Sequence, residues 1–264
     1  MLRQRIITAL ALAAAALLVV FLLPHSAMMA VLGLLVVAAA WEWSAFPGFT
    51  SRSARVVYVV CVILGVAVVW FLGRRGVVLD GVLYAAGVWW LIALVWVVAI
   101  PENVNRVSAG IAGLFVLVPA WLALVKLHEH SPNLMFFVIV LVVAADVGAY
   151  FSGRRFGRHK LAPRVSPGKT WEGVYGGVIA AALVSLVGVY VFAVPAAPFI
   201  LLSLLTVVAS IVGDLTESLF KRHAGLKDSG NLLPGHGGVL DRVDSVTAAA
   251  PVFLVGLERL GLFR

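Results

Sequence analysis

The chain has 264 residues, of which 62% are hydrophobic and 12% are charged, and its formal net charge is +8. An ordinary soluble domain holds about 45–50% apolar and about 25% charged residues, and at this length it buries only about three quarters of its unfolded surface. The composition therefore excludes a soluble globular protein and predicts an integral membrane protein that is covered largely by lipid.

Nine apolar stretches approach the ~20 residues that a helix needs to cross a bilayer. We therefore expect an all-α, polytopic transmembrane helical bundle of about nine spans, with Pro24, Pro101 and Pro198 marking breaks between helices. The first stretch also resembles a secretory signal peptide, because Arg3 and Arg5 precede its Ala/Leu run, but we favour an uncleaved helix. The predicted spans are residues 6–23, 27–47, 56–72, 77–100, 107–125, 134–151, 173–197, 199–220 and 246–262.

The chain shows no internal repeat or long linker, so we expect one integral membrane domain, residues 1–264, with N-terminal helices in 1–133 and catalytic helices and loops in 134–264. Its two largest basic loops, 152–172 and 221–245, are separated by two spans and therefore lie on the same face. The positive-inside rule makes that face cytoplasmic, although Arg74, Arg75 and Lys126 then fall on the other side. We expect a multi-pass protein of the cell inner (plasma) membrane.

Basic residues cluster between apolar segments instead of forming one long run. This distribution suits phosphate ligands and anionic lipid headgroups, and it excludes a nucleic acid as the partner. The single cysteine, Cys61, lies inside an apolar segment, so neither an intramolecular disulfide nor a cysteine-based zinc site is expected.

Asp146 lies at the end of the sixth predicted span and is followed by a loop with six Lys or Arg residues, SGRRFGRHKLAPRVSPGKTWEG. An acid within an apolar helix either binds a cation or pairs with a basic residue. The loop's SPGKT segment resembles half of a P-loop, but the first glycine is missing at the required spacing and no strand is expected before it. Ser166, Lys169 and the following helix N-terminus are nevertheless predicted to bind phosphate.

A second polar segment follows the eighth predicted span and reads DLTESLFKRHAGLKDSGNLLPGHGGVLDRVD. Asp214 poses the same choice between a cation and a basic partner, and Ser218 lies one turn later on the same helix face. Asp241 and Asp244 are three residues apart at the predicted start of the last helix, so their carboxylates share a face. Such a pair suits Mg²⁺, although acids at a helix N-terminus also stabilise the helix dipole.

Basic residues surround these acids and are predicted to contact phosphates, with glycines beside them that allow close approach of the backbone. For Lys221 and Arg222 the alternative is contact with anionic lipid at the membrane surface. His236 could contact a ligand or pack within the loop. The further residues of this predicted set are Lys227, Gly237, Gly238 and Arg242.

The stretch from Ser218 to Asp244 resembles, position for position, the signature of the phosphatidate cytidylyltransferase family, and residues 146–173 are also similar to that family. Gly168 stands where a lysine is common, so one phosphate contact is absent or supplied by Arg164. The signature positions are Ser218, Lys221, Arg222, Lys227, Asp228, His236, Gly237, Gly238, Asp241, Arg242 and Asp244.

The resemblance implies a nucleotidyltransferase of phospholipid biosynthesis that uses CTP and phosphatidic acid to make CDP-diacylglycerol. It also implies a required Mg²⁺, room for a second cation such as K⁺, contact with membrane lipids and a homodimer. On this hypothesis the metal ligands are Asp146, Asp214, Asp241 and Asp244, the catalytic residues are Asp214, Lys227, Asp241 and Asp244, and the substrate-binding residues are Ser166, Lys169, Ser218, Lys221, Arg222, His236, Gly237, Gly238 and Arg242.

Two other classes of function fit the sequence less well. A CDP-alcohol phosphotransferase is also polytopic and metal-dependent, but its Asp-Gly-x2-Ala-Arg string is absent. An ion-coupled transporter could use Asp146 and Asp214 as cation ligands, but transport alone leaves the Lys227-Asp228 and His-Gly-Gly segments unexplained, and no inverted repeat is visible.

Overall fold

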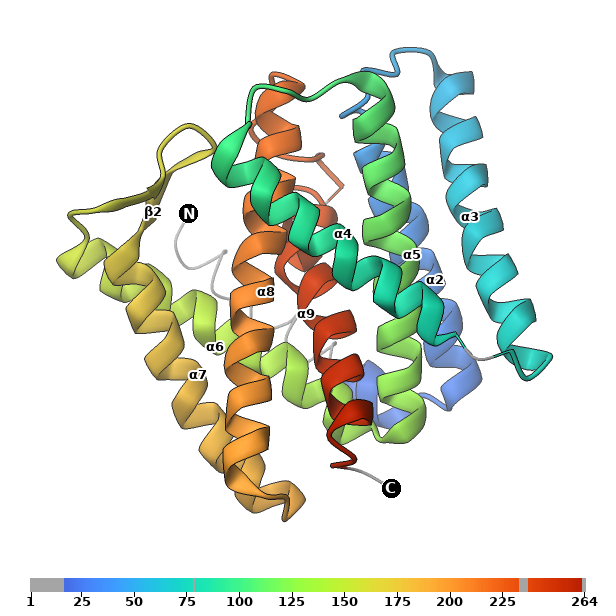
Figure 1. The fold of residues 1–264 in the computed structure, drawn as a ribbon. Coiled ribbons are helices and arrows are strands. Elements are labelled where there is room, and N and C mark those ends of the chain that lie inside the picture. The colour runs from blue at the N-terminus through green and yellow to red at the C-terminus, as the bar shows by residue number, and fades with distance from the viewer. Residues whose placement is uncertain (1–16, 78, 233–236, 263–264) are drawn as a thin grey trace.

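The computed structural model describes residues 17–77, 79–232 and 237–262, and its described part is a bundle of long helices with one small hairpin beside it (Figure 1). Apolar runs form helices here because a helix satisfies its own backbone hydrogen bonds, which lipid cannot do. The helices are α2 (His25–Trp43), α3 (Arg52–Arg74), α4 (Asp80–Ala99), α5 (Arg106–His130), α6 (Pro132–Phe156), α7 (Trp171–Phe192), α8 (Ala196–His223) and α9 (Leu240–Arg259).

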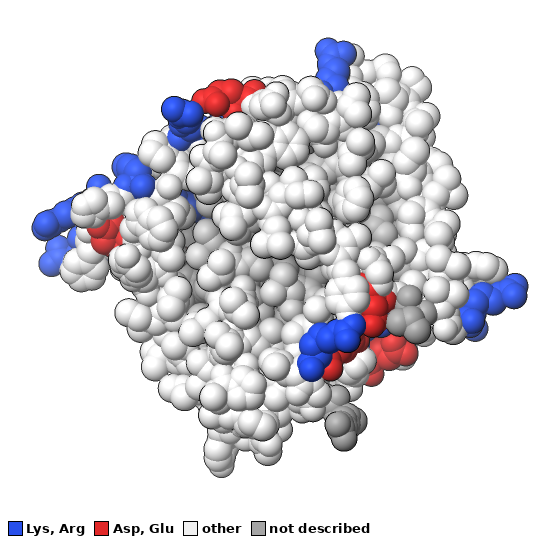
Figure 2. Space-filling model, viewed as in Figure 1, with Lys and Arg blue, Asp and Glu red and all other residues white. Residues whose placement is uncertain are grey.

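The predicted all-α, polytopic architecture is confirmed, since α2 to α8 are each long and apolar enough to cross a membrane. Charged side chains lie mainly along the margins of the face shown in Figure 2, whose middle is uncharged. The number of nine spans is not established. The first predicted span, 6–23, lies largely outside the described residues, of which 17–22 are helical, and α9 carries charges at both ends that keep it out of the seven candidate spans.

A two-stranded antiparallel hairpin between α6 and α7 departs from the prediction that no strand precedes the SPGKT segment. Strand β1 (Lys160–Ala162) pairs with β2 (Ser166–Thr170), so the SPGKT segment is itself extended. The base of the hairpin is fixed by the Trp171 amide, which donates to the His159 carbonyl at 2.9 Å. Strands this short and polar give no alternation of apolar residues, which is why the sequence pattern did not reveal them.

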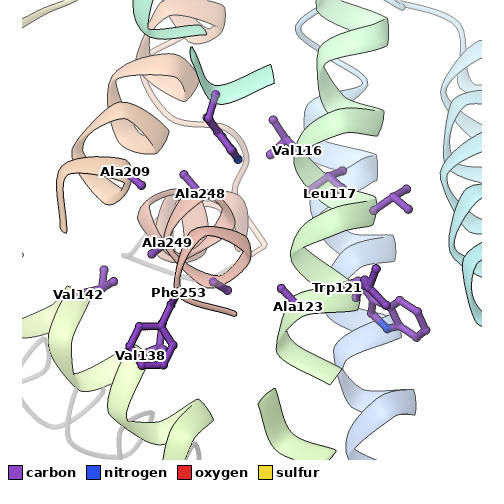
Figure 3. Packing of buried hydrophobic residues seen from close by; sticks show 14 of the residues in the cluster. Val116, Leu117, Trp121, Ala123, Val138, Val142, Ala209, Ala248, Ala249 and Phe253 are labelled. Carbon is purple, nitrogen blue, oxygen red and sulfur yellow. The ribbon is translucent and has the colours of Figure 1, made fainter. Parts of the chain in front are cut away.

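Helix α9 lies in the interior of the bundle, where it packs against α8, α5, α4, α6 and α2 (Figure 3). Its central alanines, 248–250, are fully buried and let the neighbouring helices approach closely. Helices from the first half of the chain, α2 and α5, thus share a core with α9 from the second. The labelled residues of this core are Val116, Leu117, Trp121, Ala123, Val138, Val142, Ala209, Ala248, Ala249 and Phe253.

Helices α6 and α7 cross at glycines. A methyl group added to Gly176 would lie 2.7 Å from the Gly148 carbonyl oxygen and would overlap the Ser152 side chain, and one added to Gly177 would lie 2.9 Å from the Ala145 carbonyl oxygen. Small residues permit such close backbone contact. In lipid, where the hydrophobic effect does not drive helices together, this close packing stabilises their association. This contact places Asp146 of α6 opposite α7 and the hairpin.

We expect Gly176→Ala to destabilise the protein by about 1–3 kcal/mol, because the added methyl group overpacks the crossing of α6 and α7. Gly87→Ala in α4 is the matched control, since a methyl group there meets nothing within 4 Å. The control should be neutral or more stable by up to about 1 kcal/mol, because alanine favours helix over glycine. Thermal unfolding in detergent measures both, and equal melting temperatures for the two variants would contradict the close packing at Gly176.

Candidate active site

A cavity of about 420 Å³ lies between α6, α7, α8 and the hairpin. Three residues predicted to be functional line it from three different elements: Asp146 from α6, Lys169 from β2 and Asp214 from α8. Most of the remaining wall is formed by small or apolar residues, with Arg154 as a further charged side chain. The cavity is therefore a charged pocket set among helices that cross the membrane.

Lys169 and Asp214 form an ion pair in this cavity, with 2.5 Å between Nζ and Oδ2. Both side chains are 26% exposed, so a ligand that enters the cavity can reach them. The Ser218 hydroxyl donates to the other Asp214 oxygen at 3.3 Å, as expected from its place one turn later. Of the two alternatives left open for Asp214, a cation or a basic partner, this structure shows the basic partner.

Asp146 lies in the interior of α6, which continues to Phe156 beyond the predicted end at residue 151. The Ser245 hydroxyl of α9 hydrogen-bonds to its carboxylate, and Asp146 is in electrostatic contact with Asp214, Asp244 and Lys169. Three of the four predicted metal ligands thus face one another. Asp241 belongs to a separate cluster.

The second cluster is centred on Asp241 at the start of α9. The Lys221 ammonium lies 2.8 Å from Asp241 Oδ1, and the backbone amides of Ser229 and Gly238 donate to Oδ2 at 2.9 and 2.8 Å. Lys221 is buried and points inward, with Glu217 at 3.4 Å as its other acidic neighbour. Asp241 is therefore engaged by the protein on both of its oxygens.

Glu217 connects the two clusters. It is 2% exposed, and no hydroxyl or backbone amide of the described residues donates to either of its carboxylate oxygens. Its contacts are Lys221 and the Asp244 carboxyl group. Two buried carboxyl groups in contact can both ionise only at a high cost, and a cation beside them would lower that cost.

The acids suit a hard cation that shares its ligands with a substrate. In the described part of the chain, no three Asp, Glu, His or Cys side chains converge closely enough to hold a metal by themselves. Mg²⁺ does not need such an enclosed site, because it is usually held by one or two carboxylates together with water and substrate phosphates. Asp146, Asp214 and Asp244 fit that arrangement, whereas the predicted four-acid set is not brought together.

The other predicted residues lie outside the cavity. Lys227, Arg222 and Arg242 are exposed, and Ser166 is partly exposed on β2. Gly237 adopts a left-handed backbone with φ of 81°, and a side chain there would meet Asp241. His236 lies outside the described residues.

Two alternatives were open where Gly168 replaces the common lysine: the phosphate contact is absent, or Arg164 supplies it. Gly168 lines the cavity, but Arg164, which could have replaced the missing lysine, pairs with Glu102 of the loop between α4 and α5 at 3.0 Å. In this structure Arg164 therefore ties the hairpin to that loop.

Two charged residues near these clusters were not singled out from the sequence. Arg154 lines the cavity from the last turn of α6, and Glu42 of α2 contacts the start of α9. The signal for Glu42 was present, because it is an acid within an apolar segment, as Asp146 and Asp214 are.

Comparison with known proteins finds matches over almost the whole chain. Residues 3–259 match the model of the cytidylyltransferase family. A Pseudomonas aeruginosa protein named phosphatidate cytidylyltransferase is 48% identical over 284 residues, covering 99% of this chain and 98% of that protein. A Haemophilus influenzae protein of the same name is 39% identical, covering 96% of this chain and 97% of that protein.

The contact between the hairpin and α8 predicts that both polar loops lie on one side of the membrane. In a background in which Cys61 is replaced by serine, Arg158→Cys and Asn231→Cys should react with an impermeant thiol reagent from the same side, since both positions are exposed. Glu129→Cys, in the last turn of α5 and close to the other end of α6, is the control and should react from the other side. Labelling of Arg158→Cys and Asn231→Cys from opposite sides would contradict the shared site.

Proposed function

The chain belongs to the cytidylyltransferase family, and from that premise we propose that it transfers CMP from CTP to phosphatidic acid, giving CDP-diacylglycerol and pyrophosphate. It is a nucleotidyltransferase, because both relatives are named phosphatidate cytidylyltransferase, which is an enzyme of that class. The observation that carries the proposal is the Lys169–Asp214 contact, because it joins the two polar motifs in one cavity among apolar helices.

The reaction joins two anions. An oxygen of the lipid phosphate attacks the α-phosphorus of CTP, a new phosphoanhydride bond forms, and the bond to the β-phosphate breaks so that pyrophosphate leaves. No nucleophilic side chain is required, and the main task of the protein is to offset charge repulsion and to hold the phosphates in line. A cavity between membrane helices allows the acyl chains to stay in the bilayer.

The charged side chains of the cavity match this task. Lys169 is a compact point charge that can leave Asp214 for a phosphate oxygen. Arg154, which also lines the cavity, can bind a phosphate through two parallel hydrogen bonds. We assign phosphate contacts also to Lys227, Arg222 and Arg242 of the loop region. The wider proposed set comprises Ser166, Ser218, Lys221, His236, Gly237 and Gly238.

We further propose that the reaction depends on Mg²⁺ held by Asp146, Asp214 and Asp244, with K⁺ as a second cation. Bound Mg²⁺ would neutralise phosphate charge and make the α-phosphorus easier to attack. Asp241 was predicted as a fourth ligand. In this structure its carboxylate binds the Lys221 ammonium and two backbone amides, and so it supports the loop before α9. Whether it also binds metal stays a prediction.

The remaining proposals concern the cellular setting. We propose that the protein acts in phospholipid biosynthesis as a homodimer in the inner membrane, with both polar loops facing the cytoplasm, where CTP is present. The seven apolar helices and the bacterial relatives support a multi-pass membrane protein. The basic loops support the orientation.

A single assay tests the activity. Purified protein in detergent is mixed with phosphatidic acid, Mg²⁺ and CTP labelled at its α-phosphate, and label should appear in CDP-diacylglycerol with release of one pyrophosphate per lipid formed. Excess EDTA should abolish the transfer, because uncompensated phosphate charge opposes attack. Unlabelled lipid under these conditions would contradict the proposed function, and full activity in EDTA would contradict the metal requirement.

Asp214→Asn and Asp244→Asn should each lower the rate by about 100-fold or more, since each removes a carboxylate proposed to hold the Mg²⁺ that offsets phosphate charge. Asp80→Asn is the control, because Asp80 begins α4 and contacts Arg259 at 3.5 Å away from the cavity. Turnover is compared at equal amounts of folded protein. Near-normal turnover in either site variant removes that residue from the proposed set.

Lys169 should require its own geometry as well as its charge. Lys169→Arg replaces a compact ammonium by a planar group and should lose most activity, because it can match neither Asp214 nor the phosphate in the same space. Arg158→Lys, on the exposed part of the same loop, should keep normal turnover. The measurement is the CTP-dependent rate at saturating phosphatidic acid, and an unchanged rate in Lys169→Arg would place Lys169 away from the reacting phosphates.

A further inference from the structure

Glu42 is a buried acid that joins the first half of the chain to the start of α9. It is the penultimate residue of α2 and is 2% exposed. Its carboxylate accepts hydrogen bonds from the backbone amides of Val239 at 3.0 Å and Leu240 at 2.8 Å, and from the Ser229 hydroxyl at 3.1 Å. None of the ion pairs found among the described residues includes Glu42.

The first turn of α9 explains why an acid is placed there. The residue before the helix is Val239, whose side chain cannot accept a hydrogen bond, so the first amides of α9 lack a local cap. Glu42 supplies the missing acceptors from another helix. The partial positive charge of the helix N-terminus also favours an acid at this place.

The same contacts reach Asp241. Ser229 donates its hydroxyl to Glu42 and its amide to Asp241, and Gly238 donates its amide to Asp241 while its α-carbon lies against Glu42. A methyl group added to Gly238 would come within 2.5 Å of Glu42 Oε2. Glu42 and Asp241 therefore hold the same two places of the α8–α9 loop, Ser229 and the backbone at Gly238 and Val239.

We propose that Glu42 is a positioning residue for the transfer reaction, which fixes the N-terminus of α9 so that Asp241 and Asp244 keep their places relative to α8. This inference rests on the proposed function. Asp244 follows Asp241 by three residues on α9, so a shift in the helix start moves it away from Asp214 and Glu217. A displacement of about 1 Å is enough to lower a rate by about 100-fold.

Glu42→Gln tests the proposal, because it keeps the size of the side chain but turns an NH₂ group toward amides that need an acceptor. We expect kcat to fall by at least about 10-fold and the Mg²⁺ concentration for half-maximal rate to rise, as is typical when a residue supporting a metal site is lost. Hydrogen exchange should increase in peptides that cover residues 228–244 and stay unchanged in α7. Glu42→Asp, which keeps the charge, should recover part of kcat.

Ser44→Ala is the matched control for a purely structural effect. Ser44 is fully buried at the same end of α2, but its hydroxyl contacts Trp41 and Arg55 and none of the α9 residues. It should lower the melting temperature while leaving kcat and the Mg²⁺ requirement unchanged. An equal fall of kcat in Ser44→Ala and Glu42→Gln would overturn the proposal.

Ser229→Ala keeps the test decisive if Glu42→Gln does not fold. It removes only the hydroxyl that donates to Glu42 and leaves the amide that donates to Asp241, so a smaller fall in kcat with the same rise in Mg²⁺ requirement is expected. Folded variants with kcat and Mg²⁺ dependence within twofold of wild type would overturn the role of Glu42. Inactive wild-type protein would instead contradict the proposed function.

Discussion

A charge placed among apolar helices must find its partner inside the protein, because lipid offers none. This constraint accounts for the main polar contacts of the described structure. Lys169 meets Asp214, Lys221 meets Asp241, and Glu42 meets the N-terminus of α9. Each contact joins two different elements, so the charges that serve the site also hold the hairpin, α8, α9 and α2 together.

Helix α9 is where these contacts converge. Its small, buried residues let it lie among the other helices, and its first turns carry both Asp241 and Asp244. The apolar packing sets the position of the helix along its length, while the polar contacts at its start set the position of the carboxylates. The close crossing of α6 and α7 at glycines places Asp146 on the other side of the same site. The same few helices thus provide both the close packing and the carboxylates of the site.

The sequence predicted the helices well because lipid imposes a length and a composition that any sequence must meet. It also singled out Asp146 and Asp214, since ionisable groups in apolar surroundings stand out, and Lys169, through the SPGKT segment before a helix. It could not show that Lys169 meets Asp214, because that contact depends on the α6–α7 crossing and on a hairpin too short to leave a pattern. The inward direction of Lys221 depends on the rotation of α8, which spacing alone does not fix. Glu42 carried the same signal as the other intramembrane acids, but its partners are backbone amides, which no sequence motif records.

The central claim is that CTP binds in the cavity between α6, α7, α8 and the hairpin, and photo-crosslinking tests it most directly. A photoreactive, labelled CTP analogue is bound to the protein, irradiated, and the modified peptides are identified with and without excess CTP. The account predicts label on peptides within 145–177 and 207–214, and loss of that label when CTP competes. CTP-sensitive label on the groove formed by α4, the loop after it and the start of α5 (residues 88–108), with none on the cavity peptides, would contradict it.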